Sequence, residues 1–457
     1  MIDFSTFDAY IDTHTDRFIQ RLRDLVRLPS VSAQGGPAMR QIADAVLALC
    51  LSLGYDARQV EVNPGQPPFI IAEMGPKDAQ RTLMIYNHYD VQPPEPLDLW
   101  TVPPFDVTER DELLLGRGVA DNKGNLTIRL SAIEAYRATI GELPLRVIFV
   151  IEGEEEMGSP QIAAFSQQHA DLLRTCDGCW WEAGSVNEQG QNSITMGLKG
   201  LVALEFHAKV MERDSHSANG GILPNAIWRL MEALTTLRQP DGSLTIDGLA
   251  EHLAPLNPKD LAIIADSEWS EDPLLVRMGI RELLGGRKGK EAEIQLVLRP
   301  CMSLNGIIGG YTGAGGKTVI PSEATVKSDI RLVPNLTPEL VFNLVKAHLS
   351  RRGFDDITVT ESEAGLRPSK TDPGAPIVKA AQAAILAATG MAAELVPNMA
   401  GSGPMYDLCD IHGIDTIGVG AGNPDSRAHA PDENLRRADF VMGMKIAGRF
   451  LAEFAKG

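Results

Sequence analysis

Acidic residues gather directly after an apolar run in the first half of the chain. The segment IEGEEEMGSP (151–160) follows LPLRVIFVI and contains Glu152, Glu154, Glu155 and Glu156. Like charges at this density repel one another and resist burial. Either a positively charged group compensates them or the segment is a solvated loop. A bound divalent metal is one group that would supply the missing charge.

Other residues of metal-binding type also follow apolar runs or stand in glycine-rich loops. MIYNHYD ends in His88 and Asp90, GRGVADNKG contains Asp121, CWWEAG contains Glu182, and SRAHAPDEN contains His429. In extended chain His88 and Asp90 face the same way, so the carboxylate can orient the imidazole of a metal ligand. A single histidine is more often a structural group, and a glutamate run usually faces solvent. The set as a whole nevertheless indicates a metal site.

The elements that must position these residues alternate between helix and strand. Helical periodicity covers 39–54, 125–139 and 161–174, whereas strand patterns cover 67–74, 81–90 and 145–151. This alternation predicts an α/β domain with a largely parallel central sheet flanked by helices. Ligand sites in such sheets collect at the carboxyl ends of the strands, which is where the acidic and histidine residues lie.

The pattern changes near Lys199. Strands are expected over 201–211, 323–333 and 356–365, and helices over 224–237 and 337–353. This order favours a smaller α+β sheet with helices on one face. We therefore expect an inserted domain at 199–372, which divides a larger catalytic domain into 1–198 and 373–457.

Seven motifs together resemble those of the M20 family of dinuclear metallopeptidases. They are NHYDVQP, GRGVADNKG, EGEEEMGSP, RDSHSANGG, KTVIPSEA, IRLVP and AHAPDE, and they extend over essentially the whole chain. The sequence is most similar to the branch of carnosinase-like and cytosolic non-specific dipeptidases. The resemblance implies two divalent ions per chain, zinc or alternatively manganese, and an inserted domain that acts as a lid and dimerisation domain.

The same resemblance assigns roles around the metals. His88 binds the first ion and His429 completes its shell, Asp121 bridges both ions, Glu156 is a further ligand, and Glu182 is the terminal ligand of the second ion. Asp90 orients His88. Glu155 is the general base, which takes a proton from water and later gives it to the leaving amine. Glu152 and Glu154 are expected to be solvated bystanders, and the peptide bond after Asp121 is expected to be cis.

Residues of the inserted domain resemble the family's lid residues. The resemblance implies that His216, in HSANGG, reaches across a dimer interface and stabilises the oxyanion; the alternative is a structural turn histidine. Arg331 would pair with the substrate carboxylate through its planar fork. Thr318 would contact substrate from the partner subunit, and Gly401 and Ser402 would contact its C-terminal end.

Two departures from the carnosinase-like pattern leave the substrate side chains open. Asn398 stands where those relatives carry an arginine, four residues before Ser402. The segment TDPGAPIVKAA (371–381) lacks the histidine that they place on the return from the lid.

Composition and other motifs exclude several function classes. A net charge of −18 argues against nucleic acid or anionic membrane as partners. The N-terminus has no basic region followed by an apolar one, so no signal peptide is expected. Five cysteines without framework spacing indicate a reducing compartment, and Cys176 and Cys179 of CDGC are expected to be buried thiols rather than a redox pair. GGYTGAGGKT is not a phosphate loop, because Tyr311 replaces the required glycine.

The sequence thus predicts a cytoplasmic, homodimeric enzyme that cleaves dipeptides with a free C-terminal carboxylate. Two alternatives stay open. One is an amidase or deacylase acting on N-acyl or N-carbamoyl amino acids. The other is a non-catalytic metal-binding scaffold, which would need neither a proton shuttle such as Glu155 nor an oxyanion donor such as His216.

Overall fold

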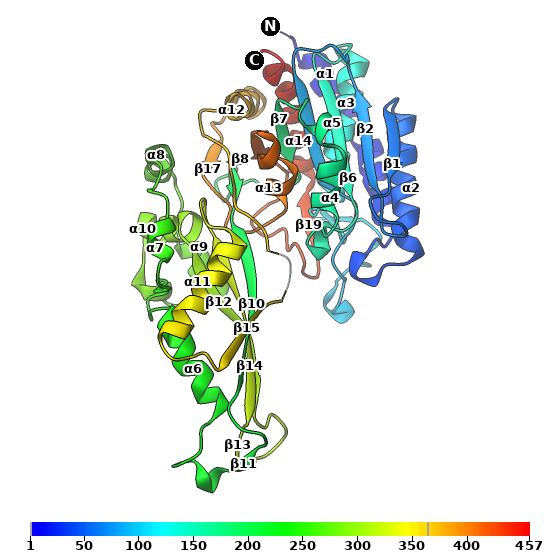
Figure 1. Cartoon of the computed structure of the whole chain (residues 1–457). Coiled ribbons are helices and arrows are strands. Elements are labelled where there is room, and N and C mark those ends of the chain that lie inside the picture. The colour runs from blue at the N-terminus through cyan, green and yellow to red at the C-terminus, as the bar shows by residue number, and fades with distance from the viewer. Residues whose placement is uncertain (1, 363–364) are drawn as a thin grey trace. The chain divides into compact units, whose positions relative to one another are not determined.

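The computed structural model describes residues 2–362 and 365–457 and divides into two compact units (Figure 1). The first unit comprises Met1–Gly197, Lys370–Val396 and Asp407–Gly457, and the second comprises Leu198–Ser369 and Pro397–Tyr406. The second unit thus takes in 397–406, which the sequence had placed in the catalytic domain. Part of the expected strand at 356–365, residues 363–364, lies outside the described residues.

The first unit is built on an eight-stranded sheet. Its strand order is β1 (Asp56–Val60), β2 (Phe69–Met74), β6 (Arg146–Glu152), β3 (Thr82–His88), β7 (Gly178–Trp181), β18 (Thr416–Gly418), β8 (Ser193–Thr195) and β17 (Glu394–Val396). The central strands β6, β3, β7 and β18 run parallel to one another, and antiparallel pairs occur toward both margins. The predicted, largely parallel sheet is confirmed.

Strands β3 and β6 explain why polar residues appear abruptly after apolar runs. All seven residues of β3 are buried, because the strand lies between β6 and β7 in the interior of the sheet. Strands buried on both faces read as continuous apolar runs rather than as alternating patterns. The two runs end in register at His88 and Glu152, so the polar segments that follow leave the same edge of the sheet.

Helices flank this sheet (Figure 1). They are α1 (Ser5–Val26), α2 (Pro37–Ser52), α3 (Lys123–Thr139), α4 (Ile162–Gln168), α5 (Ala170–Leu173), α12 (Pro376–Thr389) and α14 (Arg437–Phe454), and the short α13 (Met405–Leu408) begins at the end of the second unit's segment. Helix α3 is almost entirely buried, because it packs against α1, α14 and β3. Both chain termini lie at the same end of this unit, where Arg449 of α14 pairs with Asp8 of α1 at 2.7 Å.

A small three-stranded sheet completes the first unit. It has the order β19 (Asn434–Arg436), β5 (Leu113–Leu115) and β4 (Thr108–Arg110). The chain leaves the first unit within β9 (Gly197–Leu198) and returns to it within β16 (Ser369–Lys370), and it passes between the units again at each end of the 397–406 segment. Within the described residues, no helix combines the length and the apolar character that crossing a membrane requires.

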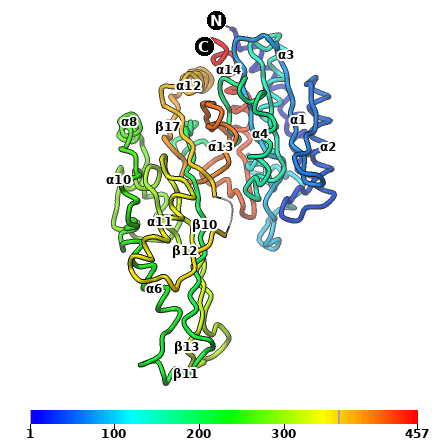
Figure 2. Tube along the Cα trace, in the orientation of Figure 1, coloured from blue at the N-terminus to red at the C-terminus, as the bar shows by residue number. Residues whose placement is uncertain are grey.

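The second unit is built on a four-stranded antiparallel sheet. Its order is β12 (Cys301–Gly309), β14 (Glu323–Leu332), β10 (Gly200–Lys209) and β15 (Ile357–Glu361). Alternate residues of β10 are buried, and α6 (Ala226–Leu237) and α11 (Pro338–Arg351) pack on that face around Leu204 and Phe206. The helices α7 (Leu249–His252), α8 (Pro258–Asp266), α9 (Asp272–Met278) and α10 (Gly289–Leu298) follow α6 in the chain. Strands β11 (Ser215–His216) and β13 (Val319–Ile320) form a separate pair, which lies beyond one end of this sheet (Figure 2).

Candidate metal and catalytic site

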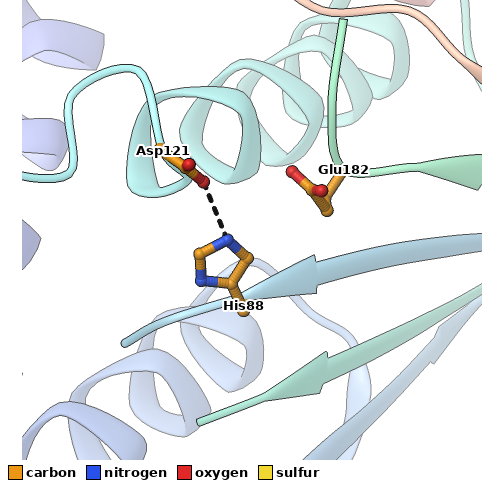
Figure 3. A group of neighbouring side chains, drawn as sticks. All are labelled: His88, Asp121 and Glu182. Atoms are coloured by element: carbon orange, nitrogen blue, oxygen red, sulfur yellow. Dashed lines mark hydrogen bonds and ion pairs between the residues drawn. The ribbon is translucent and has the colours of Figure 1, made fainter. Parts of the chain in front are cut away.

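Three elements of the first unit bring His88, Asp121 and Glu182 together. His88 ends β3, Asp121 stands just before α3, and Glu182 directly follows β7. One ligand atom from each lies within 4.8 Å of the others, and His88 Nε2 is 3.0 Å from Asp121 Oδ1. Figure 3 shows the imidazole and both carboxylates pointing into the same space. An imidazole and two carboxylates are a common ligand set for zinc or manganese.

A second group shares Asp121 with the first. Its members are Asp121, Glu156 and His429, whose ligand atoms again lie within 4.8 Å of one another. His429 Nε2 is 3.2 Å from Asp121 Oδ2 and 3.1 Å from Glu156 Oε2. Asp121 therefore presents one oxygen to each histidine, as a bridging ligand does.

The grouping corrects one expectation from the sequence. His88 and His429 were expected on the same ion, with Glu182 on the other. The structure groups His88 with Glu182 and His429 with Glu156. The reason is that the two oxygens of Asp121 face the two imidazoles separately, and so divide the histidines between two groups.

The electrostatics of the cluster fit divalent cations. Burial, reinforced by the charges of Glu182, Asp121 and Glu156, raises the pKa of Glu155 well above its ordinary value. Burial likewise raises the pKa of Glu182 to about 7. Hydrogen bonds to Asp121 and Glu156 raise the pKa of His429 to about 10. Carboxylates that resist ionisation in this way are crowded by negative charge, which two dications would compensate.

Asp90 supports both the first histidine and the glutamate turn. It is fully buried, and its Oδ1 lies 3.2 Å from His88 Nδ1, as expected for a carboxylate that orients a ligand imidazole. Its two oxygens also accept the backbone N–H groups of Glu155, at 3.3 Å, and Glu156, at 3.1 Å. Asp90 thus ties β3 to the 3-10 turn η3 (Glu155–Met157), a second contact that the sequence did not indicate.

A glycine allows that turn to lie close to β3. A Cβ atom on Gly153 would stand 2.3 Å from the ring of Tyr89, the residue before Asp90. A larger residue at 153 would therefore push the following glutamates away from Asp90. The turn closes through the N–H of Gly158, which donates to Glu155 O at 2.8 Å.

The expectation that Glu152 and Glu154 are solvated is wrong. Both side chains are buried. Glu152 accepts hydrogen bonds from the hydroxyls of Tyr86 and Ser159, the latter at 2.9 Å, and Glu154 accepts one from Gln161. These donors belong to β3 and to the segment after the turn, so they meet the glutamates only in the folded chain.

Three residues that touch the cluster were not singled out from the sequence. Asn122 Nδ2 donates to Glu182 Oε2 at 2.8 Å, and Gln92 Nε2 donates to Glu156 Oε2 at 3.0 Å. Glu433 accepts the backbone N–H of Asp121 at 3.0 Å. All three lie inside motifs that also carry a ligand or its support, namely ADNKG, DVQP and HAPDEN, and this proximity was the available signal. The expected cis peptide bond between Asp121 and Asn122 is confirmed.

The remaining predicted residues belong to the second unit, where they form two pairs. His216 is exposed in β11, with Nε2 3.4 Å from Thr318 Oγ1. Arg331 of β14 donates from Nη1 to Ser402 Oγ at 2.8 Å. Gly401 O accepts the N–H of Lys199 at 3.0 Å, which holds the Ser402 loop beside the start of β10. The roles of these residues toward a substrate stay predictions.

The chain is similar to known proteins over most of its length. The model of Peptidase family M20/M25/M40 matches residues 84–453. The rat Beta-Ala-His dipeptidase is 28% identical over 98% of this chain and 94% of the relative, and the Cys-Gly metallodipeptidase dug1 of Schizosaccharomyces pombe is 30% identical over 75% and 74%.

Solved structures are similar over almost the full length. The M20 family metallo-carboxypeptidase Sso-CP2 from Sulfolobus solfataricus superposes with a TM-score of 0.88 at 31% identity, covering 96% of this chain and 99% of that one. The dipeptidase Dug1p from Saccharomyces cerevisiae has a TM-score of 0.84 at 25% identity, covering 100% and 99%.

Proposed function

Because the chain belongs to the M20 family of peptidases, we propose that it hydrolyses the amide bond of dipeptides that carry a free C-terminal carboxylate. The observation that carries the proposal is Asp121, whose two oxygens are divided between two ligand groups. The carboxyl of Glu155 belongs to neither group but interacts electrostatically with Asp121. Relatives named as dipeptidases, which align over nearly the whole chain, support a small peptide as the substrate.

The proposed cofactor is a pair of divalent cations, zinc or alternatively manganese. His88, Asp121 and Glu182 would hold one ion, and Asp121, Glu156 and His429 the other. Such a pair supplies Lewis-acid chemistry: it lowers the pKa of water and polarises a carbonyl group. Three protein ligands per ion leave the open position that a catalytic site needs.

Glu155 is the proposed proton carrier. Neither ligand group includes it, and within the described part of the chain its two oxygens are not taken up by backbone N–H groups as those of Asp90 and Glu433 are. Burial and the charges of Glu182, Asp121 and Glu156 raise its pKa, so it holds a proton more readily than an ordinary carboxyl does. It would take the proton of the attacking water and deliver it to the leaving amine, which makes it general base and then general acid. Asp90, through the N–H groups of Glu155 and Glu156, would hold the turn that presents it.

Substrate recognition is assigned to the second unit. We propose that Arg331 pairs with the substrate carboxylate, and the bond to Ser402 supports this because it fixes the guanidinium in advance. Gly401, Ser402 and Thr318 would contact the rest of the substrate, and His216 of a partner subunit would stabilise the oxyanion. Asn398 is buried against Val297 O, which favours a preferred dipeptide different from that of the Beta-Ala-His dipeptidases.

We further propose that the protein is a homodimer whose two copies meet through the second unit. β12 is an edge strand that exposes Leu304, Ile307 and Ile308, and the adjacent α6 exposes Trp228 and Met231. Exposed apolar side chains on an edge strand are covered well by a second copy related by two-fold symmetry. Ile308→Lys should therefore convert a sedimenting dimer into monomer, and an unchanged sedimentation coefficient would contradict this interface.

We also propose that the protein works in the cytoplasm. The five cysteines are unpaired, and four of them are buried, including Cys176 and Cys179 of the CDGC segment. Unpaired thiols persist where the compartment is reducing.

The first experiment is a reconstitution assay. The protein is stripped with chelator, restored separately with Zn²⁺ or Mn²⁺, and tested for amino acid release from dipeptides, tripeptides, and N-acyl and N-carbamoyl amino acids. Metal-restored cleavage of dipeptides is expected. Preference for acylated amino acids would favour the amidase alternative. Preference for tripeptides would favour a carboxypeptidase, the activity named for the Sulfolobus relative. No turnover with two bound ions would favour the scaffold.

A further inference from the structure

The buried carboxylate of Glu433 is saturated by the loop that carries Asp121. Its Oε1 accepts the N–H groups of Ala120, at 2.9 Å, and Asp121, at 3.0 Å. Its Oε2 accepts the N–H of Gly118 at 2.9 Å and the Nη1 of Arg117 at 2.7 Å. The side chain is 0% exposed, so these four donors replace all of its contact with water.

Glu433 also belongs to the loop that carries His429. That loop ends at β19, which pairs with β5, and the loop with Asp121 begins where β5 ends. The backbone continues this pairing for one more bond, from Gly116 N to Glu433 O at 3.0 Å. The two ligand-bearing loops therefore leave the same strand pair, and the Glu433 side chain joins them where they separate.

We propose that Glu433 is a positioning residue for the bridging carboxylate. It makes no bond to the Asp121 side chain, but it fixes the backbone from Gly118 to Asp121 through three N–H groups. That backbone determines whether one Asp121 oxygen faces His88, at 3.0 Å, while the other faces His429, at 3.2 Å. The proposal rests on the proposed metal centre. It adds to that centre a residue that lies more than 300 positions after Asp121 in the chain.

Glutamine cannot replace Glu433 in this role. In either orientation its amide places an NH₂ group against two donors, the N–H groups of Ala120 and Asp121 or the donors of Gly118 and Arg117. Arg117 would also stay buried without a carboxylate, because its other hydrogen bond goes to the neutral Pro93 O, at 3.2 Å. The isosteric change therefore releases the loop that carries Asp121 without replacing any of the proposed metal ligands.

The test is metal affinity, measured without turnover. Chelator-stripped protein is titrated with Co²⁺ in competition with a chromophoric chelator, and the visible spectrum of the bound Co²⁺ reports the ligand geometry. Glu433→Gln should bind about 10–100-fold more weakly and with an altered spectrum. Asp432→Asn is the matched control. Asp432 is the buried residue next to Glu433, and its carboxylate accepts hydrogen bonds from Thr101 rather than from the loop that carries Asp121. The Asp432→Asn protein should therefore bind Co²⁺ with the affinity and the spectrum of wild type.

Glu433→Asp keeps the test valid if the glutamine variant folds poorly. The aspartate retains the charge beside Arg117 but is one methylene too short to reach both sets of donors, so the chain should fold and still bind Co²⁺ more weakly. Wild-type affinity and spectrum in a variant, with only a lower unfolding temperature of the metal-free protein, would overturn the proposal. Failure of wild type itself to bind two ions would instead overturn the metal centre.

Discussion

Glu152 gives a quantitative prediction about stability and pH. Its side chain is 1% exposed, and burial, helped by the charge of Asp90, raises its pKa from 4.5 to about 7 against the opposing bonds from Tyr86 and Ser159. The folded chain therefore keeps the proton up to about pH 7, whereas the unfolded chain releases it near 4.5. The stability associated with this group is present below pH 4.5 and is lost as pH rises through about 7.

The size of the loss follows from that difference in pKa. At about 1.4 kcal/mol for each pH unit, a rise from 4.5 to about 7 corresponds to about 3 kcal/mol. Glu152→Gln should remove the penalty, because Tyr86 and Ser159 both donate to the same oxygen and an amide carbonyl can accept both. Relative to wild type, the variant should thus gain up to about 3 kcal/mol between pH 5 and pH 8.

The assay is urea unfolding of chelator-stripped protein at pH 5, 6, 7 and 8, followed by tryptophan fluorescence. Metal-free protein is used because bound dications would lower the pKa of nearby carboxyls. Glu142→Gln makes the same substitution at an exposed site and is the control. A stability difference between Glu152→Gln and wild type that does not change with pH would refute the reasoning.

Three further substitutions test individual roles. His216→Ala should lower kcat about 10²–10³-fold with metal content unchanged; a loss of stability alone would instead identify a structural turn histidine. Arg331→Lys keeps the charge but not the planar fork, so KM for dipeptides should rise about tenfold while substrates with an amidated C-terminus respond little; equal losses for both would exclude carboxylate recognition. Asp90→Asn should weaken binding of the ion held by His88 about 10–100-fold in a chelator competition. Unchanged affinity would show that His88 needs no carboxylate partner.

The sequence predicted the parts of the fold that depend on local pattern. The apolar runs of β3 and β6 are long, buried on both faces and followed at once by polar residues, so their type and the location of the site at their carboxyl ends could be predicted. The ligand types were also identifiable, because His88 ends a strand, Glu182 follows one, and Asp121 stands just before a helix.

Features that depend on contacts between distant segments could not be predicted. The burial of Glu152 depends on Tyr86 and Ser159, which meet only when β3 and β6 pair. The division of the two histidines between the ligand groups depends on the direction of each Asp121 oxygen. Residues 397–406 join the second unit because Gly401 and Ser402 bond to Lys199 and Gly200, far earlier in the chain.

The central claim is that Glu155 moves protons beside a pair of ions that it does not bind. The most direct measurement is metal content and dipeptide turnover of Glu155→Gln in the same sample, with wild type prepared alongside. The account predicts two ions per chain and a kcat lowered about 10²–10⁴-fold, because the amide keeps the shape of the side chain but cannot accept the proton. Retained turnover with two ions bound would exclude Glu155 as the base, and loss of one ion would make it a metal ligand instead.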